Sequence, residues 1–388
     1  MAINNISYNL DFIKKILASS FIIFNFINRD ISNILLIFTL IVCIIDFQKL
    51  LLTLSKHKKL LFIIIMFTFW ISLSAYVNNT PLSELDNYFR FLLLIPLLTV
   101  KFKLDDFQTV IPVTAISSLC LLLFDYYYID SLRFSGTSSF YLTFAYMITV
   151  MLVMTILILI STSNNNYQKI ILLASAIIFT IVWVSSGARG PAIGVLFSLF
   201  VMLLWTKNMK LLFLSFIVLA ILASQHNPLF ERMKNINDIN ITSPSENKHY
   251  SLRERVTYLH FGINTIKKNY LIGLGPHNVE DTMGEFISKL NINAKARDHL
   301  HNDFIDIASK FGLPALFLLL LMYFYMYKSS NSNRTVLLLL TLLVLSQITQ
   351  SQFSHHQAMS FFIFLIYIFI NDNIDFIDNE SRHKKYIT

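Results

Sequence analysis

The sequence predicts an all-α protein that crosses a membrane about twelve times and carries one large polar loop, and three observations lead to this fold class. The 388 residues are 55% hydrophobic, with a mean hydropathy of +0.59. Only 14% are charged, against about 25% in soluble domains. The apolar residues form blocks near the ~20 residues that a helix needs to cross a bilayer, without the alternation of a β-barrel. A water-soluble fold is therefore excluded.

The candidate membrane spans are the apolar blocks of the chain. Lys14 and Lys15 precede an apolar run as in a signal peptide, but no cleavage site follows, so we interpret this run as the first span. No repeat relates the two halves of the chain, and no block is clearly interrupted. The predicted spans cover residues 10–28, 31–48, 60–77, 88–101, 107–125, 139–160, 169–186, 190–205, 210–225, 303–327, 335–351 and 357–371.

The basic residues indicate the orientation of these spans. If the N-terminus is cytoplasmic, sixteen lysines and arginines fall in cytoplasmic segments, whereas the short outer loops hold only Arg29, Arg133 and Arg189. This imbalance fits the positive-inside rule in one orientation only, with both termini on the inner side of a cytoplasmic membrane. The net charge of +8 thus reports topology, and no nucleic-acid partner is needed to explain it. The sixteen residues are Lys14, Lys15, Lys49, Lys56, Lys58, Lys59, Lys101, Lys103, Lys169, Lys207, Lys210, Lys328, Arg334, Arg382, Lys384 and Lys385.

One polar segment, residues 226–302, is long enough to be exempt from the charge rule and is predicted to lie outside. It divides the chain into three parts. Residues 1–225 hold spans one to nine, residues 226–302 form the outer loop, and residues 303–388 hold the last three spans and a cytoplasmic tail. Eight of the nine glycines lie between Gly187 and Gly312. Backbone freedom is thus concentrated around the loop, where we expect the functional site.

Two short amphipathic helices are predicted within the loop. Ser251 and Glu254 form a capping-box pattern, so a helix should start there with Arg255 in its first turn. A second helix should follow the turn at Gly273–Asn278. We expect both helices to lie along the membrane surface. Their apolar positions, which recur at helical spacing, are Val256, Leu259, Ile263 and Ile266 in the first helix and Val279, Met283, Phe286 and Leu290 in the second.

Arginines next to apolar spans are costly and mark functional candidates. Arg90, Arg189 and Arg255 all map to the outer side. Arg189 lies in the tight connection Ser185–Pro191, and a guanidinium there could bind a diphosphate through paired hydrogen bonds. Arg255 stands at a predicted helix start, where backbone N–H groups also attract anions. The alternative is that Arg90 and Arg189 reach toward anionic head groups and that Arg255 is a solvated helix residue.

The histidines at the end of the loop are candidates for acid–base chemistry. His299 and His301 lie in Arg297–Asp303, directly before a long apolar block, where a lipid-linked substrate would present its head group. An imidazole can take a proton from an attacking hydroxyl near neutral pH. With the nearby aspartates, His-x-His is alternatively half of a metal site, although no complete ligand set can be picked from the sequence. His355 and His356 either line the same cavity or are solvated.

Three segments of the sequence together resemble one protein family. They are, in order, Ser185–Arg189 at the start of a span, Ser251–Arg255 leading to Ile272–Pro276, and His299–Asn302 followed by an apolar helix with Phe311–Leu316. In this arrangement they are similar to the bacterial O-antigen ligases, within the O-antigen ligase and polymerase superfamily of inner-membrane proteins. The resemblance covers about residues 180–320.

This resemblance implies a C-type glycosyltransferase fold and an inverting transfer of polysaccharide from undecaprenyl diphosphate to a sugar hydroxyl of lipid A-core, on the periplasmic side of the membrane. It also implies that no cofactor, nucleotide sugar or metal is needed. By position, Arg189 and Arg255 resemble the diphosphate-binding arginines of the family, and His301 resembles its catalytic histidine. Two guanidiniums could stabilise the charge that develops on the leaving diphosphate. The supporting candidates are Arg90, His299 and Asn302.

Three alternatives stay open at the level of sequence. An O-antigen polymerase would use the same donor but transfer it to another lipid-linked unit, and the single long outer loop with His299–Asn302 favours the ligase. A transporter of lipid-linked sugars would need mid-bilayer charges, broken helices and repeated halves. A membrane scaffold would leave Arg189, Arg255 and His301 without a purpose. The oligomeric state, the polysaccharide and the acceptor sugar stay undetermined.

Overall fold

The computed structural model describes residues 2–102, 104–129, 134–138, 141–161, 165–188, 190–207, 213, 250–291, 294–331 and 333–371, without the side chains of residues 2–8, 104, 105, 161 and 250–253. Within these ranges the regular elements are all helices. Five of them are long and apolar enough to cross a membrane, a bent pair makes a sixth, and three shorter helices are also apolar. The chain is a multi-pass membrane protein, as predicted. The span predicted at 210–225, apart from residue 213, and residues 226–249 and 292–293 of the outer loop lie outside the described residues.

The helices follow the predicted blocks closely, with two exceptions given below. They are α1 (Ala2–Phe24), α2 (Arg29–Ile45), α3 (Phe47–Lys56), α4 (Lys58–Val77), η1 (Leu82–Leu85), α5 (Asp86–Leu93), η2 (Ile95–Thr99), α6 (Leu104–Phe124), η3 (Asp125–Ile129), α7 (Tyr141–Ser161), α8 (Asn166–Ser185), α9 (Gly190–Thr206), α12 (Tyr250–Lys268), η6 (Pro276–Asn278), α13 (Val279–Lys289), α14 (Asp303–Ser329), α15 (Arg334–Thr349), η7 (Gln352–Ser354) and α16 (His356–Ile370).

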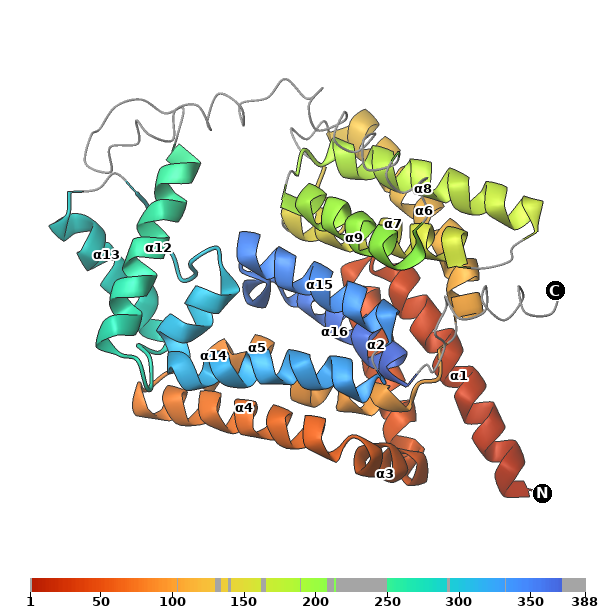
Figure 1. Ribbon diagram of the computed structural model, residues 1–388, viewed down its shortest axis with the longest axis horizontal. Coiled ribbons are helices and arrows are strands. Elements are labelled where there is room, and N and C mark those ends of the chain that lie inside the picture. Colours follow the sequence, from red (N-terminus) through yellow and green to blue (C-terminus); the bar gives the residue numbers. More distant parts are fainter. Residues whose placement is uncertain are drawn as a thin grey trace.

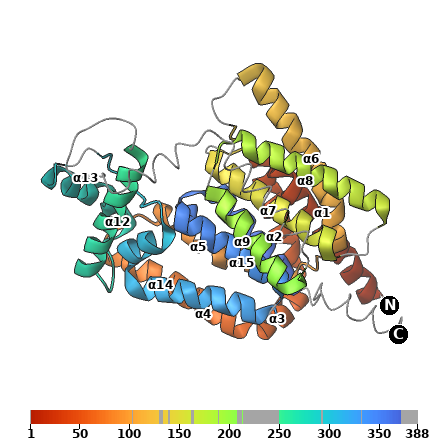
Figure 2. The ribbon, with the colours of Figure 1, turned by 45° about the horizontal axis from the view of Figure 1, so that its top comes forward.

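The membrane helices form one bundle with two distinct ends (Figure 1). Helices α4 and α14 pack together on one side and α6, α7 and α8 on the other (Figure 2). Helix α16 lies between them (Figure 1), and its side chains are buried. At the end that carries α12 and α13, which we call the loop end, Ser74 Oγ of α4 donates to Ile272 O (2.6 Å). At the other end, the basic end, Lys56 Nζ donates to Asn371 Oδ1 after α16 (3.1 Å).

The predicted span 31–48 is broken, because α2 and α3 meet at an angle of 88°. Asp46 stands at the bend and accepts from the buried ammonium of Lys14 (2.6 Å). Lys49 on α3 donates in turn to Asp11 of α1. A carboxylate between two helices thus ties the bend to α1, and the expectation of uninterrupted spans is wrong at this place.

The predicted span 88–101 is not one helix. Helix α5 ends at Leu93, and the 3₁₀ turn η2 with Pro96 at its start continues the path. Residues 86–99 nevertheless run alongside the whole of α16, since Asp86 lies 3.4 Å from His356, Tyr367 Oη donates to Phe91 O (2.8 Å) and the amide of Asn371 donates to Leu98 O. Side chains of α16 therefore satisfy carbonyls that a continuous helix would satisfy internally.

A kink in α14 positions the start of this helix. Gly312 has φ = +83° and ψ = 171°, which divides α14 into a short first part and a long second part. The loop between α12 and α13 pairs with this kink: Leu274 N donates to Ser309 O, Gly275 N to Lys310 O and Leu313 N to Tyr270 O, each at 2.8 Å. A Cβ at Gly312 would lie 1.8 Å from Leu271 O, so only glycine permits this approach.

Helices α12 and α13 pack on each other through a small core of their own, formed with Leu300. Val279 and Met283 of α13 are buried in it, as the predicted stripe requires. On α12 the buried face carries Tyr258 and Phe261, whereas members of the predicted stripe face outward: Leu259 is 43% and Ile263 40% exposed. Helix α12 thus turns its aromatic side chains to α13 and leaves Leu259 and Ile263 on its outer face. The membrane-surface position of both helices stays a prediction.

Candidate functional site

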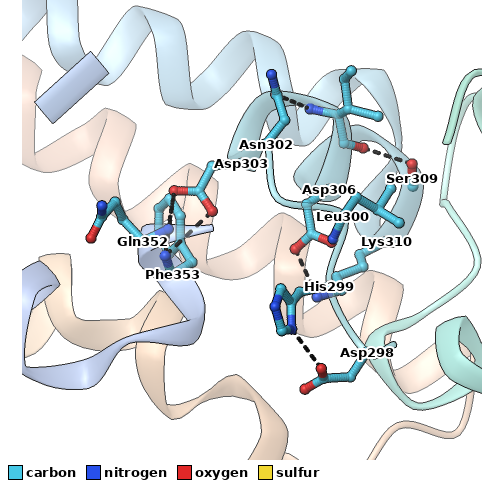
Figure 3. Close-up of polar contacts among 11 residues, drawn as sticks. Asp298, His299, Leu300, Asn302, Asp303, Asp306, Ser309, Lys310, Gln352 and Phe353 are labelled. Atoms are coloured by element: carbon cyan, nitrogen blue, oxygen red, sulfur yellow. Dashed lines mark hydrogen bonds and ion pairs between the residues drawn. The ribbon is translucent and has the colours of Figure 1, made fainter. Parts of the chain in front are cut away.

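The histidine segment before α14 is fixed by hydrogen bonds on both of its sides. Asn302 caps α14, since its Oδ1 accepts from Ile305 N (3.1 Å), and its amide donates to Ile348 O of α15 (3.2 Å). Asp306, one turn into α14, accepts from Leu300 N (3.1 Å). Figure 3 shows this turn, with Asn302 above and the side chain of Asp306 directed back to the segment. The loop that carries His301 is thus held to two membrane helices.

His301 has a left-handed backbone, with φ = +54°. A residue other than glycine adopts this region at a cost, usually where the surroundings over-determine it. Its Nδ1 lies 3.2 Å from Oε1 of Gln350, which follows α15. An amide oxygen only accepts, so Nδ1 carries the proton and Nε2 keeps its lone pair. This is the tautomer that a general base acting through Nε2 needs.

Two rings enclose His301 between the loop and α12. The ring of Tyr258 lies 5.7 Å away and is tilted by 32°, and the ring of His299 lies 4.7 Å away, edge to face. Tyr258 is fixed in turn, because its hydroxyl donates to Lys295 O (2.9 Å). His299 donates through Nδ1 to Asp298 (2.6 Å), and this hydrogen bond lowers the pKa of Asp298 to about 2. Both neighbours of His301 therefore have defined orientations.

Burial and surrounding charge keep His301 neutral. Burial, the largest cause, acts together with the charges of His299, Arg255 and Arg297 to lower its pKa to about 4. The hydrogen bond to Gln350 acts in the opposite direction. His301 is therefore unprotonated near neutral pH and available as a base.

The charge of Arg255 acts on His301 in the folded chain. Arg255 lies in the first turns of α12 with an exposed side chain, and its charge reaches both His301 and the hydroxyl of Tyr146 on α7. The same helix thus supplies a ring against His301 and a guanidinium beside it. Arg255 has solvent access on one side, which a binding role for an anion requires.

Arg189 lies outside the described residues, but the residue after it is placed. A Cβ added to Gly190 would lie 2.6 Å from Tyr146 Oη and 3.5 Å from Thr349 Oγ1, so the start of α9 lies against the end of α15. Tyr146 and Thr349 also hydrogen-bond to each other. Thr349 precedes Gln350, the partner of His301. The start of α9 therefore belongs to the same neighbourhood as His301 and the charge of Arg255.

Arg90 is engaged in contacts that join α5 to α16. Its guanidinium donates to Asp86 (3.0 Å), to the carbonyl of His356 (3.1 Å) and to Ser360, and lies 3.0 Å from Nδ1 of His356. These contacts favour a structural role over head-group binding. A direct supporting role of Arg90 at the site stays a prediction.

Two residues of the site were not foreseen, Gln350 and Tyr258, which touch His301. His355, which the sequence left as either a cavity residue or a solvated one, lies with its Nε2 3.2 Å from Nε2 of Gln350. The signal for Gln350 is its position in Gln350-Ser-Gln352, a polar cluster at the end of an apolar block. No pattern in the sequence pairs this cluster with the loop fifty residues earlier, because the pairing depends on the packing of α15 against α14.

Buried carboxylates connect the two segments of the site (Figure 3). Asp303 accepts from Gln352 N (2.9 Å) and Phe353 N (3.3 Å), which fixes the turn after Gln350. Asp306 forms a buried ion pair with Lys310 (2.7 Å) while it accepts from Leu300 N. In the part of the chain that the structure describes, no three His, Cys, Asp or Glu side chains form a set suited to a metal ion.

Residues 173–320 match the model of a protein family described as O-antigen ligase. The matched range runs from α8 into α14 and includes both loop helices, the start of α9 and His301. No curated protein matches the chain.

Proposed function

Through residues 173–320 the chain is a member of the O-antigen ligase and polymerase family, and from this premise we propose that it transfers a polysaccharide from undecaprenyl diphosphate to a sugar hydroxyl of lipid A-core. The observation that carries the proposal is the state of His301. Its Nδ1 lies 3.2 Å from Gln350 Oε1, burial lowers its pKa, and the positive charge of Arg255 acts on it. A base next to an anion-binding group is what a hydroxyl attack on a diphosphate-linked sugar requires.

In the proposed reaction, His301 Nε2 takes the proton of the acceptor hydroxyl while the hydroxyl oxygen attacks the anomeric carbon of the donor sugar. The bond from this carbon to the diphosphate oxygen breaks, and undecaprenyl diphosphate leaves with the electron pair. A single displacement inverts the anomeric carbon. The Nδ1–H of the imidazolium continues to donate to Gln350 Oε1 throughout. Arg189 and Arg255 are the proposed diphosphate ligands.

The donor itself should strengthen the base. In the free protein the charges of Arg255, Arg297 and His299 oppose protonation of His301. A bound diphosphate brings negative charge next to these groups, and an opposite charge favours the protonated imidazole. The pKa of His301 is then expected to rise toward neutrality only in the donor complex, where proton transfer is useful.

We further propose about twelve crossings, with the loop end in the periplasm and the basic end in the bacterial cytoplasm. Successive helices support this arrangement by running between the two ends: α1 ends near Gln357 at the start of α16, and α9 ends near Arg334 at the start of α15, where the guanidinium lies 5.7 Å from the Trp205 ring. A further crossing at 210–225 would then lead to the outer loop.

The proposal is tested in a strain that lacks this protein, by the pattern of its lipopolysaccharide on gels. We expect wild type to restore capped lipopolysaccharide, and His301→Ala to fail at matched membrane abundance while polymer accumulates on undecaprenyl diphosphate. His277→Ala is the control, since this loop histidine has a 61% exposed side chain and contacts Glu84 instead of the site. Core capped with one repeat unit would indicate a polymerase, and an unchanged pattern in the deletion strain would refute both activities.

A further inference from the structure

Gln350 stands between two imidazoles, one before α14 and one before α16. Its Oε1 lies 3.2 Å from Nδ1 of His301, and its Nε2 lies 3.2 Å from Nε2 of His355. The side chain is buried, so these imidazoles replace water as its partners. We propose that Gln350 and His355 are positioning residues that hold His301 with its proton on Nδ1 and Nε2 free to act as the base; this inference rests on the proposed function.

The chemistry of an amide makes this arrangement directional. Oε1 only accepts and Nε2 only donates, so the two ends of Gln350 cannot exchange without reversing both imidazoles. His355 accepts the amide N–H through an unprotonated Nε2, which turns Oε1 toward His301. His301 must then donate from Nδ1. His355 thus selects the orientation of the amide, and the amide selects the tautomer of His301.

The backbone around Gln350 is held so that this chain of contacts has a fixed geometry. Gln350 N donates to Ser346 O of α15 (2.9 Å), and Asp303 of α14 accepts from the next residues, Gln352 and Phe353. His356, directly after His355, is held by Arg90. Arg90 therefore contributes to the site indirectly, because its contact with His356 fixes the start of α16 next to His355.

The charged groups that face the two imidazoles come from several elements. His301 faces Arg255 and Tyr258 of α12, together with His299 and Arg297 of the preceding segment. His355 faces His299 and Asp298 of that segment and His356 of α16. The groups that act on both rings are predominantly cationic, so both imidazoles are neutral, as the directional contacts require. Burial, followed by these positive charges, lowers the pKa of His355 to about 4.

The test uses the purified full chain with undecaprenyl diphosphate-linked polysaccharide and lipid A-core. Gln350→Met removes the acceptor at nearly constant size, and we expect kcat to fall on the order of a hundredfold, since a general base contributes at least this much. Gln350→Glu keeps an acceptor for Nδ1–H and adds a negative charge. We expect this variant to be active, with the acid limb of its pH–rate profile moved upward by on the order of one pH unit.

His355 provides the second arm of the test. His355→Leu should lower kcat in the wild-type background, because the amide loses the group that orients it. In the Gln350→Glu background the same substitution should have no further effect, since both oxygens of a carboxylate accept and no orientation has to be selected. Equal losses in both backgrounds would show that His355 is only structural and would overturn the proposal. Inactivity of Gln350→Glu at every pH, in a protein that melts like wild type, would also overturn it.

A readout independent of transfer separates this inference from the proposed function. Diethyl pyrocarbonate modifies unprotonated imidazoles only, so mass spectrometry of the peptide with His301 across a pH series reports its protonation directly. We expect the midpoint to move to higher pH in Gln350→Glu and not in the control His277→Ala. A shifted midpoint in an enzyme without transfer activity would support the contact and refute the ligase. Wild-type transfer with an unmoved midpoint would refute the contact alone.

Discussion

His301 combines a strained backbone with a constrained ring. Among the described residues the other non-glycine positions with positive φ are Asn79, Lys207, Asn291 and Asn331, and asparagine tolerates this region better than most residues. The strain at His301, of the order of 1–3 kcal/mol, is maintained by the hydrogen bonds that Leu300 and Asn302 make on either side. The imidazole is thereby directed to Gln350 and to the charge of Arg255 before any substrate binds.

Two substitutions of Arg255 separate the hydrogen bonds of its guanidinium from the effect of its charge on the pKa of His301. Arg255→Lys keeps the charge but loses the planar fork, so we expect a donor KM raised on the order of tenfold, the equivalent of one charge-assisted hydrogen bond. Arg255→Gln removes the charge as well. Because a nearby cation opposes protonation, the pKa of His301 should rise, and the acid limb of the pH–rate profile should move to higher pH in this variant only. Coinciding limbs in the two variants would contradict the electrostatic coupling.

At the scale of elements, the kink of α14 and the turn before α13 form one unit. The segments Ile272–Pro276 and Phe311–Leu316 are separate motifs in the sequence. The structure pairs them through backbone hydrogen bonds, and Trp70 of α4 adds a bond from Nε1 to Phe311 O (2.9 Å). The first part of α14, which carries Asp303 and Asp306, is oriented by this unit. The glycines of these motifs therefore affect the site indirectly, because they permit the backbone pairing that orients the first part of α14.

Gly312→Ala should test this unit. A Cβ at this position would overlap Leu271 O, and φ = +83° is strained for alanine, so we expect a loss of about 3 kcal/mol or more in unfolding free energy. Thermal unfolding in detergent measures the effect. Gly284→Ala is the matched control: it lies within α13 with its nearest neighbour, Ala296 Cβ, at 3.8 Å, and should be neutral or stabilising by about 0.5–1 kcal/mol. Equal melting temperatures for the two variants would contradict the pairing.

The ion pair of Asp306 and Lys310 allows stability and positioning to be separated. Asp306→Leu leaves a buried ammonium without its partner, at an expected cost of about 3–5 kcal/mol. Adding Lys310→Met should restore most of this loss, because an apolar pair removes the uncompensated charge. Leu300 N would still lack its acceptor, so transfer should stay reduced in the double variant. Full recovery of transfer together with stability would show that Asp306 has no positioning role.

At the scale of the whole molecule, the bundle separates its chemistry by end. The loop end carries the histidine segment, the start of α9 and α12, whereas Lys14, Lys49 and Lys56 lie at the basic end. Hydropathy was sufficient to predict the helices, since each block must satisfy its backbone internally. It could not predict the breaks at Asp46 and Leu94, where side chains distant in the sequence provide the hydrogen bonds.

The candidate site was predictable to a similar degree. His301 and Arg255 carry charge or titrate next to apolar blocks, which is a local signal, and the structure brings them together. Gln350 and Tyr258 carry no such signal, because they act through contacts made by tertiary packing. The helical spacing of Leu259 and Ile263 locates one face of α12, but the neighbours decide which face is covered, and α13 covers the face with Tyr258 and Phe261.

The proposed orientation predicts the accessibility of the two ends. In a chain without Cys43 and Cys120, a single cysteine at position 277 should react with an impermeant maleimide in cells with a permeable outer membrane. A cysteine at Lys58, an exposed residue at the start of α4, should react only after the inner membrane is opened. The labelled fraction of each variant, compared with that in detergent, measures this. Labelling of both positions, or of Lys58→Cys alone, in closed cells would invert or abolish the proposed topology.

The irregular segment 86–99 has a consequence for how the protein is made. An eight-residue helix followed by a 3₁₀ turn is far shorter than an independent crossing needs. The carbonyls of Phe91 and Leu98 find their donors on Tyr367 and Asn371, at the far end of the chain. During synthesis these carbonyls therefore lack their donors until α16 and Asn371 have been made. The contacts of residues 86–99 are thus complete only after α16 has been made, and a chain stopped before α16 should be a substrate for membrane proteases.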